Sequence, residues 1–254
     1  MFEVTARMRI RDGELDGFKQ RAADIMRLTR EQDTETLRYD WFVSKDGTSC
    51  EVREGYLDAD GLVDHNTHVR ESRDALFRDH AYGHDMTIYG EPSPALAALM
   101  DGMAGHVKFN RFSLLQGLDG TEGGKATFEA TARLKIREGK LEAFKQQAAE
   151  VLRQMREQDE QPLRYDWFLS DDGIQCEVRE GYVDADALLK HQQEIAGAKM
   201  KLFGECVDGH TMSFYGEVSP ALAAALQQMG PPYQQFVFFQ GLDAGIELFE
   251  EVRA

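Results

Sequence analysis

The residues best suited to chemistry are a carboxylate and several aromatic side chains at strand-like spacing. Tyr39 and Trp41 alternate in one segment, and Glu54 and Tyr56 alternate in the next. Side chains two residues apart on a strand share a face, and we expect this face to point into the space between the sheet and a partner sheet. There, Glu54 could hold or remove a phenolic proton. The structural alternative is an aromatic core in which tyrosine hydroxyls or an arginine hold Glu54, since an unpaired buried carboxylate is costly.

A histidine follows this carboxylate within the next predicted helix. His65 lies one helical turn beyond the strand end, and Asn66 comes directly after it. At the mouth of a pocket, such a histidine could act as a general base or orient a substrate. The structural alternative is a partly buried histidine that packs the helix against the sheet.

The whole arrangement occurs twice. Leu-Arg-Tyr-Asp-Trp-Phe at 37–42 returns at 163–168, and Cys-Glu-Val-Arg-Glu-Gly-Tyr at 50–56 returns at 176–182, both displaced by 126 positions. A period this long indicates a whole domain. We therefore expect a first repeat at 1–119, a linker at 120–126, a second repeat at 127–243 and a tail at 244–254. The expected catalytic residues are His65, Glu54, His191 and Glu180, and the expected substrate-binding residues are Tyr39, Trp41, Tyr56, Asn66, Tyr165, Trp167 and Tyr182.

Eight further side chains could in principle bind metal. The positions of His65, His68, His80 and His84 in the first repeat hold His191, Glu194, Cys206 and His210 in the second. No motif fixes how these residues approach one another, so no metal is expected. The sequence also lacks a glycine-rich phosphate loop and a nucleophile elbow, and no cofactor is expected. Cys50 and Cys176 lie in strand-like sequence, which favours small buried thiols in a reducing compartment.

The elements that position these residues follow from hydrophobic periodicity. The first repeat predicts strands at 2–10, 37–44, 49–57, 84–90 and 107–116, with helices at 14–32, after Asp58, at 69–79 and from Ser93 to about Met100. Asp46-Gly47 is a hairpin signal, and Ser93-Pro94 is typical of a helix start. The order is that of a ferredoxin-like α+β unit with an extra helix and a terminal strand.

Composition narrows the class of protein. The 254 residues are 42% hydrophobic and carry a net charge of −16. This charge argues against a nucleic-acid or anionic-membrane partner, and no apolar run approaches a membrane span. The chain opens with strand-like sequence, and no signal peptide is visible. We therefore expect a cytoplasmic protein.

The third-strand motif and the helix after it resemble a known family. Glu54-Gly55-Tyr56, Asp58-Ala59-Asp60, Leu62 and His65, followed by Tyr89-Gly90-Glu91 and Ser93, are similar to the pattern of the antibiotic biosynthesis monooxygenase family, within the dimeric α/β-barrel superfamily. The second repeat offers Glu180-Gly181-Tyr182, Asp184-Ala185-Asp186, Leu188, His191 and Tyr215-Gly216-Glu217. The resemblance implies two antiparallel sheets that face each other as a barrel, with the last strand of each reaching its partner. Here the partners would be fused repeats, an intrachain pseudo-dimer with further association left open.

The resemblance also implies a function. The family includes small oxygenases that oxidise polycyclic phenols without metal or flavin, and relatives that degrade haem. It implies a cofactor-independent monooxygenase-like protein that acts on a small aromatic or quinone-type molecule in an inter-sheet pocket. The alternative is a non-catalytic ligand binder of the same fold. The repeated Tyr-x-Trp and Glu-x-Tyr favour the enzyme. The binder is favoured because the Asn, Trp and Arg set of the family is not clearly reproduced.

The repeats differ most in the helices after His65. Asn66, His68, Arg70, Arg73, His80 and Tyr82 become Gln192, Glu194, Ala196, Lys199, Cys206 and Asp208. The first repeat keeps more basic and hydrogen-bonding groups near the expected pocket mouth. We therefore expect a working site in the first repeat, with His65 at its rim, unless this helix is merely exposed and free to drift.

Overall fold

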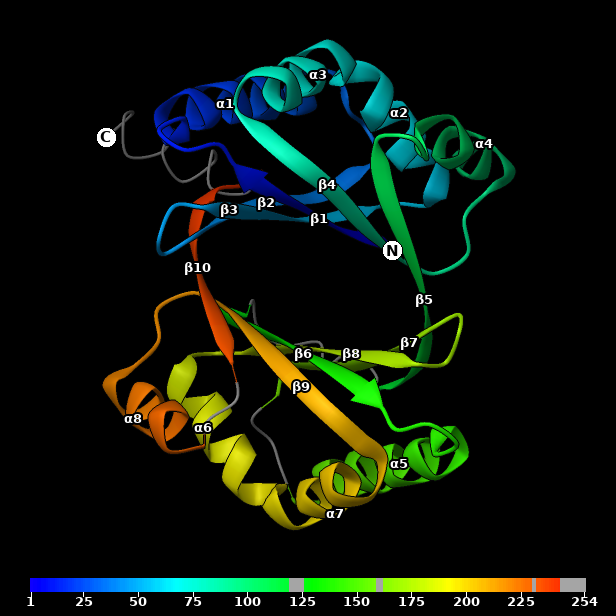
Figure 1. Ribbon diagram of the computed structural model, residues 1–254, viewed down its shortest axis with the longest axis vertical. Coiled ribbons are helices and arrows are strands. Elements are labelled where there is room, and N and C mark those ends of the chain that lie inside the picture. The colour runs from blue at the N-terminus through cyan, green and yellow to red at the C-terminus, as the bar shows by residue number, and fades with distance from the viewer. Residues whose placement is uncertain (119–125, 159–161, 230–231, 243–254) are drawn as a thin grey trace. The chain divides into compact units, whose positions relative to one another are not determined.

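The computed structural model describes residues 1–118, 126–158, 162–229 and 232–242. The chain divides into two compact units (Figure 1). The first unit contains residues 1–111 and the segment that begins at Phe236, and the second contains residues 112–235. The predicted linker at 120–126 lies outside the described residues except for residue 126, and the predicted tail at 244–254 lies entirely outside them. None of the helices in the described ranges combines the length and apolar character that a membrane crossing requires.

The first repeat contains the elements expected from its sequence. They are β1 (Phe2–Ile10), α1 (Leu15–Gln32), β2 (Thr36–Ser44), β3 (Ser49–Tyr56), α2 (Ala59–His68), α3 (Arg70–Asp79), β4 (Ala81–Tyr89), α4 (Pro94–Met103) and β5 (Val107–Gly117). Strand β4 begins at Ala81 rather than near His84, because Ala81 and Tyr82 extend its ladder with Ile10 and Arg9 beyond an irregularity in register.

The second repeat gives the same order of elements. They are β6 (Phe128–Ile136), α5 (Leu141–Gln158), β7 (Arg164–Ser170), β8 (Gln175–Tyr182), α6 (Ala185–Glu194), α7 (Ala196–Cys206), β9 (Val207–Tyr215), α8 (Pro220–Met229) and β10 (Tyr233–Gln240). In each repeat the central strand pairs antiparallel with both neighbours, β1 with β3 and β4, and β6 with β8 and β9. The mixed α+β, ferredoxin-like architecture expected from the sequence is therefore confirmed for each repeat.

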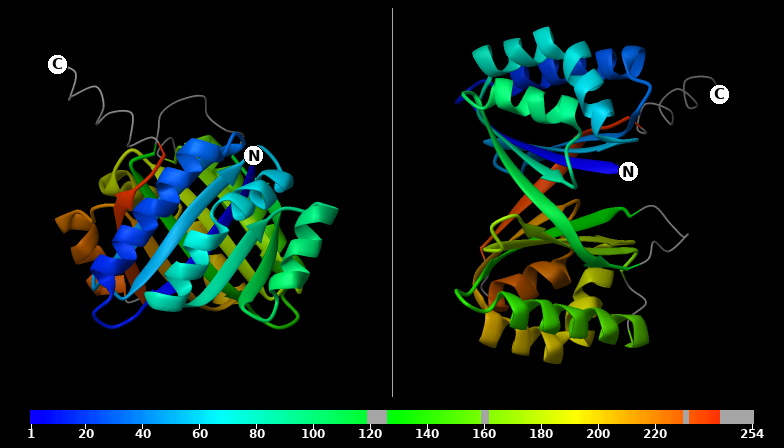
Figure 2. Two further views of the ribbon diagram at one scale, coloured as in Figure 1. Left: turned by 90° about the horizontal axis from the view of Figure 1, so that it is seen from above. Right: turned by 90° about the vertical axis from the view of Figure 1, so that its right-hand side faces the viewer.

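Helices cover one face of each sheet within its own unit (Figure 2). In the first unit, Phe18 and Ile25 of α1 share one buried cluster with Val4, Trp41 and Val52 of the strands. The expectation that this face points toward a partner sheet is wrong. The apolar stripe of α1 must also be buried, and the nearest apolar surface is its own sheet. The prediction that the two sheets pair through their apolar faces depended on that orientation, and the observed packing does not support it.

The opposite face of the same sheet is polar. Arg7 and Glu51 lie across from each other on β1 and β3, with Nε and Oε1 3.4 Å apart, and Arg53 follows on β3. Glu51 and Arg53 are buried despite their charge. Every residue of β3 is in fact buried, so burial alone does not distinguish its two faces.

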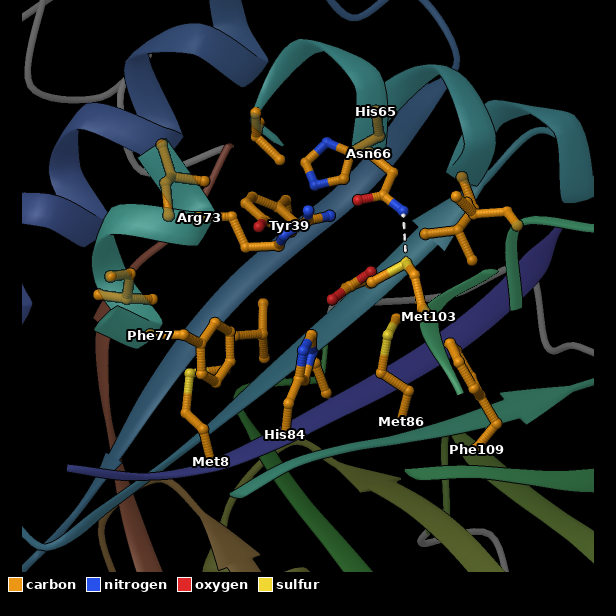
Figure 3. Close-up of a pocket in the computed structure, with 18 of the residues that line it drawn as sticks. Met8, Tyr39, His65, Asn66, Arg73, Phe77, His84, Met86, Met103 and Phe109 are labelled. Atoms are coloured by element: carbon orange, nitrogen blue, oxygen red, sulfur yellow. Dashed lines mark hydrogen bonds between the residues drawn. The ribbon is translucent and has the colours of Figure 1, made fainter. Parts of the chain in front are cut away.

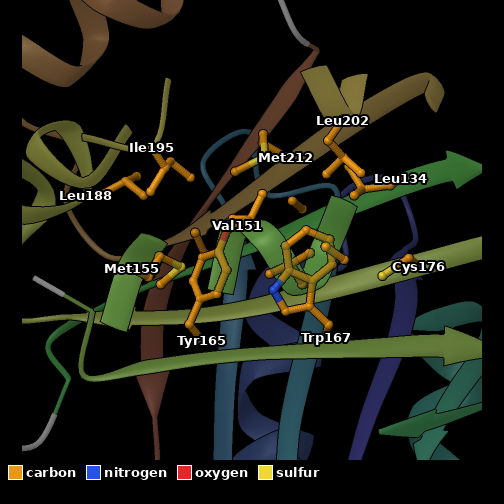
Figure 4. Packing of buried hydrophobic residues seen from close by; sticks show 14 of the residues in the cluster. Leu134, Val151, Met155, Tyr165, Trp167, Cys176, Leu188, Ile195, Leu202 and Met212 are labelled. Atoms are coloured by element: carbon orange, nitrogen blue, oxygen red, sulfur yellow. The ribbon is translucent and has the colours of Figure 1, made fainter. Parts of the chain in front are cut away.

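The second unit has an equivalent core (Figure 4). Trp167 and Tyr165 of β7 pack with Val151 and Met155 of α5 in one buried cluster. Cys50 and Cys176 are buried in the two cores, as predicted, and burial raises the pKa of both thiols. They are small core groups that keep their protons at neutral pH.

Two side-chain caps fix the helices that border the first-unit core. Asp58 accepts hydrogen bonds from the backbone N–H groups of Asp60 and Gly61 at 2.8 and 3.3 Å, and so begins α2. Ser93 accepts from the backbone N–H of Leu96 at 3.1 Å and begins α4, with Pro94 in its first turn. The Ser93 hydroxyl also donates to Asp60, which ties the starts of α2 and α4 together.

The last strand of each repeat ends in the other unit. In β10, residues Phe236–Gln240 pair with β2 of the first unit, and Gln240 lies opposite Trp41. In β5, residues Phe112–Gly117 pair with β7 of the second unit, and Gln116 lies opposite Trp167. Each sheet is therefore completed by a strand that the other repeat encodes.

This exchange predicts that a substitution late in the second repeat destabilises the first unit. Phe239 packs against the first-unit core, so Phe239→Ala should lower the free energy of unfolding by about 2 kcal/mol. Fluorotryptophan labelling gives Trp41 and Trp167 separate fluorine NMR signals, one in each unit. The Trp41 signal should shift in Phe239→Ala, and the Trp167 signal should shift in the matched variant Leu115→Ala, whose side chain packs against the second core. The reverse pattern would contradict the exchange.

Candidate functional site

A pocket lies between the sheet and the helices of the first unit. Its empty space, including solvent at the open side, is about 610 Å³, and side chains from β1 to β5 and from all four helices of the repeat line it. The wall is mainly aromatic and sulfur-containing, with Met8, Tyr39, Trp41, Phe77, Met86, Met100, Met103 and Phe109. The labelled side chains converge on this space (Figure 3). The expected aromatic pocket therefore exists, but it belongs to one unit and is not an inter-sheet pocket.

Glu54 provides a buried carboxyl group at the base of the pocket. Its Oε2 accepts a hydrogen bond of 2.7 Å from the Tyr56 hydroxyl. Burial raises the pKa of Glu54, although the charge of His65 and the bond from Tyr56 oppose the rise. Among the described residues, the pocket lining includes Glu54 but not Tyr56. Tyr56 therefore holds the Glu54 carboxyl group without lining the pocket itself. Both proposed roles of Glu54, as a structural group and as a site residue, are thus compatible with its position.

His65 is held by a carboxylate that sequence reasoning missed. Asp33 follows α1 directly, and its Oδ2 lies 2.6 Å from Nδ1 of His65. Its Oδ1 lies 2.7 Å from Nδ1 of His68, and Thr36 donates to Oδ2 at 2.8 Å. His65 is 4% exposed, so it lies within the pocket wall and not at the rim. Its ring also packs against Tyr39, with centroids 4.6 Å apart.

These contacts set the ionisation of Asp33. Burial alone would raise its pKa, but the hydrogen bond and charge of His65, together with the bonds from His68 and Thr36, lower the pKa overall. Asp33 is therefore ionised at neutral pH. An ionised acceptor at Nδ1 favours the His65 tautomer that carries its proton there, which leaves Nε2 as a hydrogen-bond acceptor.

His84 and Arg73 also line the pocket. The His84 ring stacks on Phe77, with centroids 4.4 Å apart and planes at 21°. Burial, and then the positive charge of Arg73, lower the pKa of His84 to about 4, so its imidazole is neutral at pH 7. The sequence placed His84 only among possible metal ligands. The signal for its present role is its spacing of two residues from Met86, which puts both side chains on one face of β4.

Asn66 spans the pocket between two helices. Its Nδ2 donates to Sδ of Met103 at 3.4 Å, which links α2 to α4 (Figure 3). The expected substrate-binding residue therefore borders the pocket, and a ligand group could replace this weak sulfur acceptor.

The corresponding space in the second unit is divided. One cavity of about 390 Å³ includes Tyr165, Trp167 and Glu180, and another of about 650 Å³ lies toward α8. Both cavities share Gln192, Lys199, Phe203, His210 and Met212. Lys199, in the place of Arg73, is bonded through Nζ to Oε1 of Gln192 and lies 5.4 Å from the Phe203 ring centre. Burial lowers the pKa of Lys199, and Glu180 opposes this effect.

The other expected site residues of the second repeat lie deeper. The Tyr182 hydroxyl donates to Oε2 of Glu180 at 2.7 Å, as Tyr56 does to Glu54. His191 is fully buried, with its ring centroid 5.0 Å from that of Tyr165. Among the described residues, neither His191 nor Tyr182 lines the cavity that contains Glu180. The partner position of Asp33 is Asp159, which lies outside the described residues.

Replacing Lys199 by a small residue should join the two cavities of the second unit. We expect Lys199→Ala to create a site that binds 2-naphthol at least about 10-fold more tightly than the natural second unit does. Calorimetry on a background in which Leu99→Trp fills the first pocket isolates this signal. The control is Lys201→Ala, which removes an exposed charge from the same helix. Equal binding by both variants would show that Lys199 does not divide the space.

Across the ranges that the structure describes, no three histidine, cysteine, aspartate or glutamate side chains gather as metal ligands. Two of the histidines considered as metal ligands instead contact single carboxylates. His68 contacts Asp33, and Nδ1 of His80 lies 2.8 Å from Oε2 of Glu14 at the start of α1.

The fold is that of a ferredoxin-like protein with a pocket between helices and sheet. The family model for antibiotic biosynthesis monooxygenase matches residues 127–198. The second repeat thus carries a domain of the antibiotic biosynthesis monooxygenase family, and the resemblance predicted from the sequence is confirmed. No curated protein matches the chain.

Solved structures share the fold across most of the chain. A "putative monooxygenase" from Fusobacterium nucleatum aligns with a TM-score of 0.59 at 12% identity, over 83% of this chain and 89% of its own. A "putative monooxygenase" from Lactobacillus acidophilus gives 0.55 at 9%, over 83% and 91%. A chlorite dismutase from Candidatus Nitrospira defluvii gives 0.50 at 13%, over 89% and 94%. These identities establish a shared fold and no particular reaction.

Proposed function

We propose that the protein is a monooxygenase that oxidises a small phenolic or quinone-type molecule in the pocket of the first unit. One observation carries the proposal: the buried Asp33–His65 pair opens onto an aromatic and methionine-lined pocket. A base held by a carboxylate in a largely apolar cavity is suited to removing a proton from a phenol. The family match in the second repeat supports the same class of reaction.

The residues fit distinct steps. Nε2 of His65 would accept the hydroxyl proton, which leaves a phenolate oxygen on the ring. Neutral His84 could donate a hydrogen bond to the ring oxygen. Trp41 offers a further donor, because its Nε1 is buried and has no hydrogen-bond partner among the described residues.

The overall reaction balances with molecular oxygen as the oxidant. A phenol with a free ring position loses its hydroxyl hydrogen and one ring hydrogen. That ring carbon gains an oxygen atom as the O–O bond breaks, and the second oxygen leaves with both hydrogens as water. The product is a quinone, and the electrons lost by the ring reduce the oxygen molecule. The apolar wall would hold the planar ring and limit access of water to the intermediate.

Oxygen uptake tests this proposal directly. Dihydroxynaphthalenes and hydroxyanthracenes should consume oxygen in the presence of the protein. With labelled oxygen gas, the quinone should gain one labelled atom. A quinone without label would indicate dehydrogenation or autoxidation and would contradict the assignment.

A second candidate is a non-catalytic binder of the same aromatic molecules. It is favoured by the Tyr56–Glu54 bond, which engages one oxygen of the buried carboxyl group structurally. Glu54→Gln tests whether Glu54 contributes to ligand binding under either function. Since a neutral amide preserves shape and one acceptor, we expect an unchanged melting temperature. A functional site should show altered phenol affinity, measured by calorimetry, and identical affinity would make Glu54 a structural group.

We further propose that the two units close into one barrel within a single chain, as an intrachain pseudo-dimer. The strands β5 and β10, which each begin in one unit and end in the other, support this proposal. Light scattering should give the mass of one chain for the ligand-binding species. Ligand binding confined to a larger species would contradict it.

A further inference from the structure

A second, open hollow adjoins the mouth of the first-unit pocket. The two share Asn66, Arg73, Phe77, His84, Leu99 and Met103, so the hollow is directly adjacent to the pocket. Beyond the shared residues, the hollow is bordered by Arg70 and Arg78 of α3, Arg11, and His106. The proposed reaction assigns no role to these outer groups.

The charge of this hollow is opposite to that of the chain. Four arginines line it, and Asp74 is the one acidic residue among the described residues of its border. The whole chain has 45 acidic and 29 basic residues, so an arginine-rich mouth is unlike the rest of the molecule. Acidic side chains elsewhere would repel an anion, and the hollow is a local exception to that field.

The arginines differ in how far neighbours neutralise them. Arg73 contacts Asp74 at 2.7 Å, and Arg78 contacts Asp79 at 2.7 Å. Arg70 is exposed and forms no ion pair or hydrogen bond with any described residue. Arg70 therefore supplies a cation at the mouth that forms no salt bridge within the described ranges, and Arg73 supplies one at the junction with the pocket.

The second repeat has lost this arrangement. Arg70, Arg73 and Arg78 correspond to Ala196, Lys199 and Gly204, and Tyr82 corresponds to Asp208. Arg11 is retained as Arg137, but its Nε lies 3.1 Å from Oδ1 of Asp208. These differences accompany the presence of two separate cavities in the second unit, both bordered by Lys199. An open pocket and a cationic mouth thus occur together in the first unit.

We propose that the mouth binds an acidic group of the ligand, so that the molecule bound by the first unit is an aromatic acid. Its ring lies among the aromatic and methionine side chains, and its anionic group lies against Arg70 and Arg73. A guanidinium matches the geometry of a carboxylate or sulfonate, and charge-assisted hydrogen bonds fix orientation as well as adding affinity. This inference rests on the proposed ligand pocket and names the class of its ligand, but it does not require turnover.

Calorimetry with three matched compounds tests the inference. These are 2-naphthol, 6-hydroxy-2-naphthoate and 6-hydroxynaphthalene-2-sulfonate, which share a hydroxylated ring and differ in the group at the far end. At low ionic strength we expect one or both anions to bind about 10-fold more tightly than 2-naphthol. The preference should shrink at about 0.5 M salt, since the mouth is open to solvent. The anion that binds more tightly shows whether the mouth fits a planar carboxylate or a tetrahedral sulfonate.

Variants locate the effect. Arg70→Ala, which reproduces the second repeat, should reduce the anion preference about threefold, and the double variant with Arg73→Lys should reduce it further while 2-naphthol still binds. The control is Arg27→Ala, which removes one exposed charge from α1 that lines neither the pocket nor the hollow and should leave the preference unchanged. Equal affinity for all three compounds, or an anion preference that survives in the double variant, would overturn the inference.

The outcome is separable from that of the proposed reaction. Anion preference without oxygen uptake would leave this inference standing and defeat the monooxygenase proposal. Oxygen uptake with 2-naphthol favoured over both acids would do the reverse. Failure of every compound to bind would defeat both.

Discussion

Replacing His65 by glutamine should lower the rate of oxygen uptake about 10²- to 10⁴-fold, the usual contribution of a positioned general base. Glutamine is close to histidine in size and keeps a hydrogen-bonding group, but it cannot accept a proton at neutral pH. The pocket wall should remain intact, since the Tyr39 ring and Asp33 still contact a side chain at position 65. Phenol affinity should therefore change much less than turnover, as measured by calorimetry and an oxygen electrode.

The second repeat provides the matched control. His191 occupies the same position, but it does not line the cavity that contains Glu180 in the described part of the chain. His191→Gln should leave oxygen uptake within about twofold of the natural rate, because His191 does not line the first pocket and distant sites act nearly independently. If His191→Gln caused the greater loss, the working site would be in the second unit. If neither variant lost activity, the base would be a different group.

Replacing Asp33 by asparagine should lower the free energy of unfolding by about 3 kcal/mol, because it breaks a buried network and leaves its partners without an anionic acceptor. Asp33 joins the end of α1 to two histidines of α2 and to Thr36 at the start of β2. Its side chain is only 3% exposed. The asparagine amide would also present a donor where the His65 and His68 rings now donate.

The same contacts fix the pH dependence of stability. The folded-state pKa of Asp33 lies below its ordinary value. Its contribution is therefore fully present above the unfolded pKa of about 3.9 and is lost as the pH falls through the lower folded value. Urea unfolding between neutral and acid pH should show a steeper loss for the natural chain than for Asp33→Asn. Asp64→Asn, on the exposed face of α2, is the control, and an equal effect there would exclude a special role for Asp33.

Much of the fold follows from local sequence patterns. The alternation in Phe2–Ile10 and the stripe of Phe18, Ala22 and Ile25 define a strand and a helix that must share a core. The Glu-Gly-Tyr motif occurs in both halves of the chain and is part of the pattern that resembles the family. The model of that family matches the second repeat. Such signals are short-range and depend on only one element at a time.

The side of the sheet that carries the site could not be predicted in the same way. Strand β3 is buried along its entire length, including Glu51 and Arg53, so polarity does not reveal which face the helices cover. Asp33 was missed because it lies 32 residues before His65, and no spacing rule connects a helix end to a later helix. The two cavities of the second unit are bordered by Lys199, which donates to Gln192, and such a side-chain contact depends on packing that no local pattern predicts.

The exchanged strands constrain how the two repeats can evolve. The second repeat has a divided pocket and no arginine-rich mouth, and a duplicated copy that loses its site is usually free to decay or be deleted. Here, deletion of the second repeat would remove the strand opposite Trp41 and the Phe239 side chain that packs on the first-unit core. Selection on the first pocket therefore also acts on a strand encoded more than a hundred residues away, and it preserves a second copy for its contribution to its neighbour.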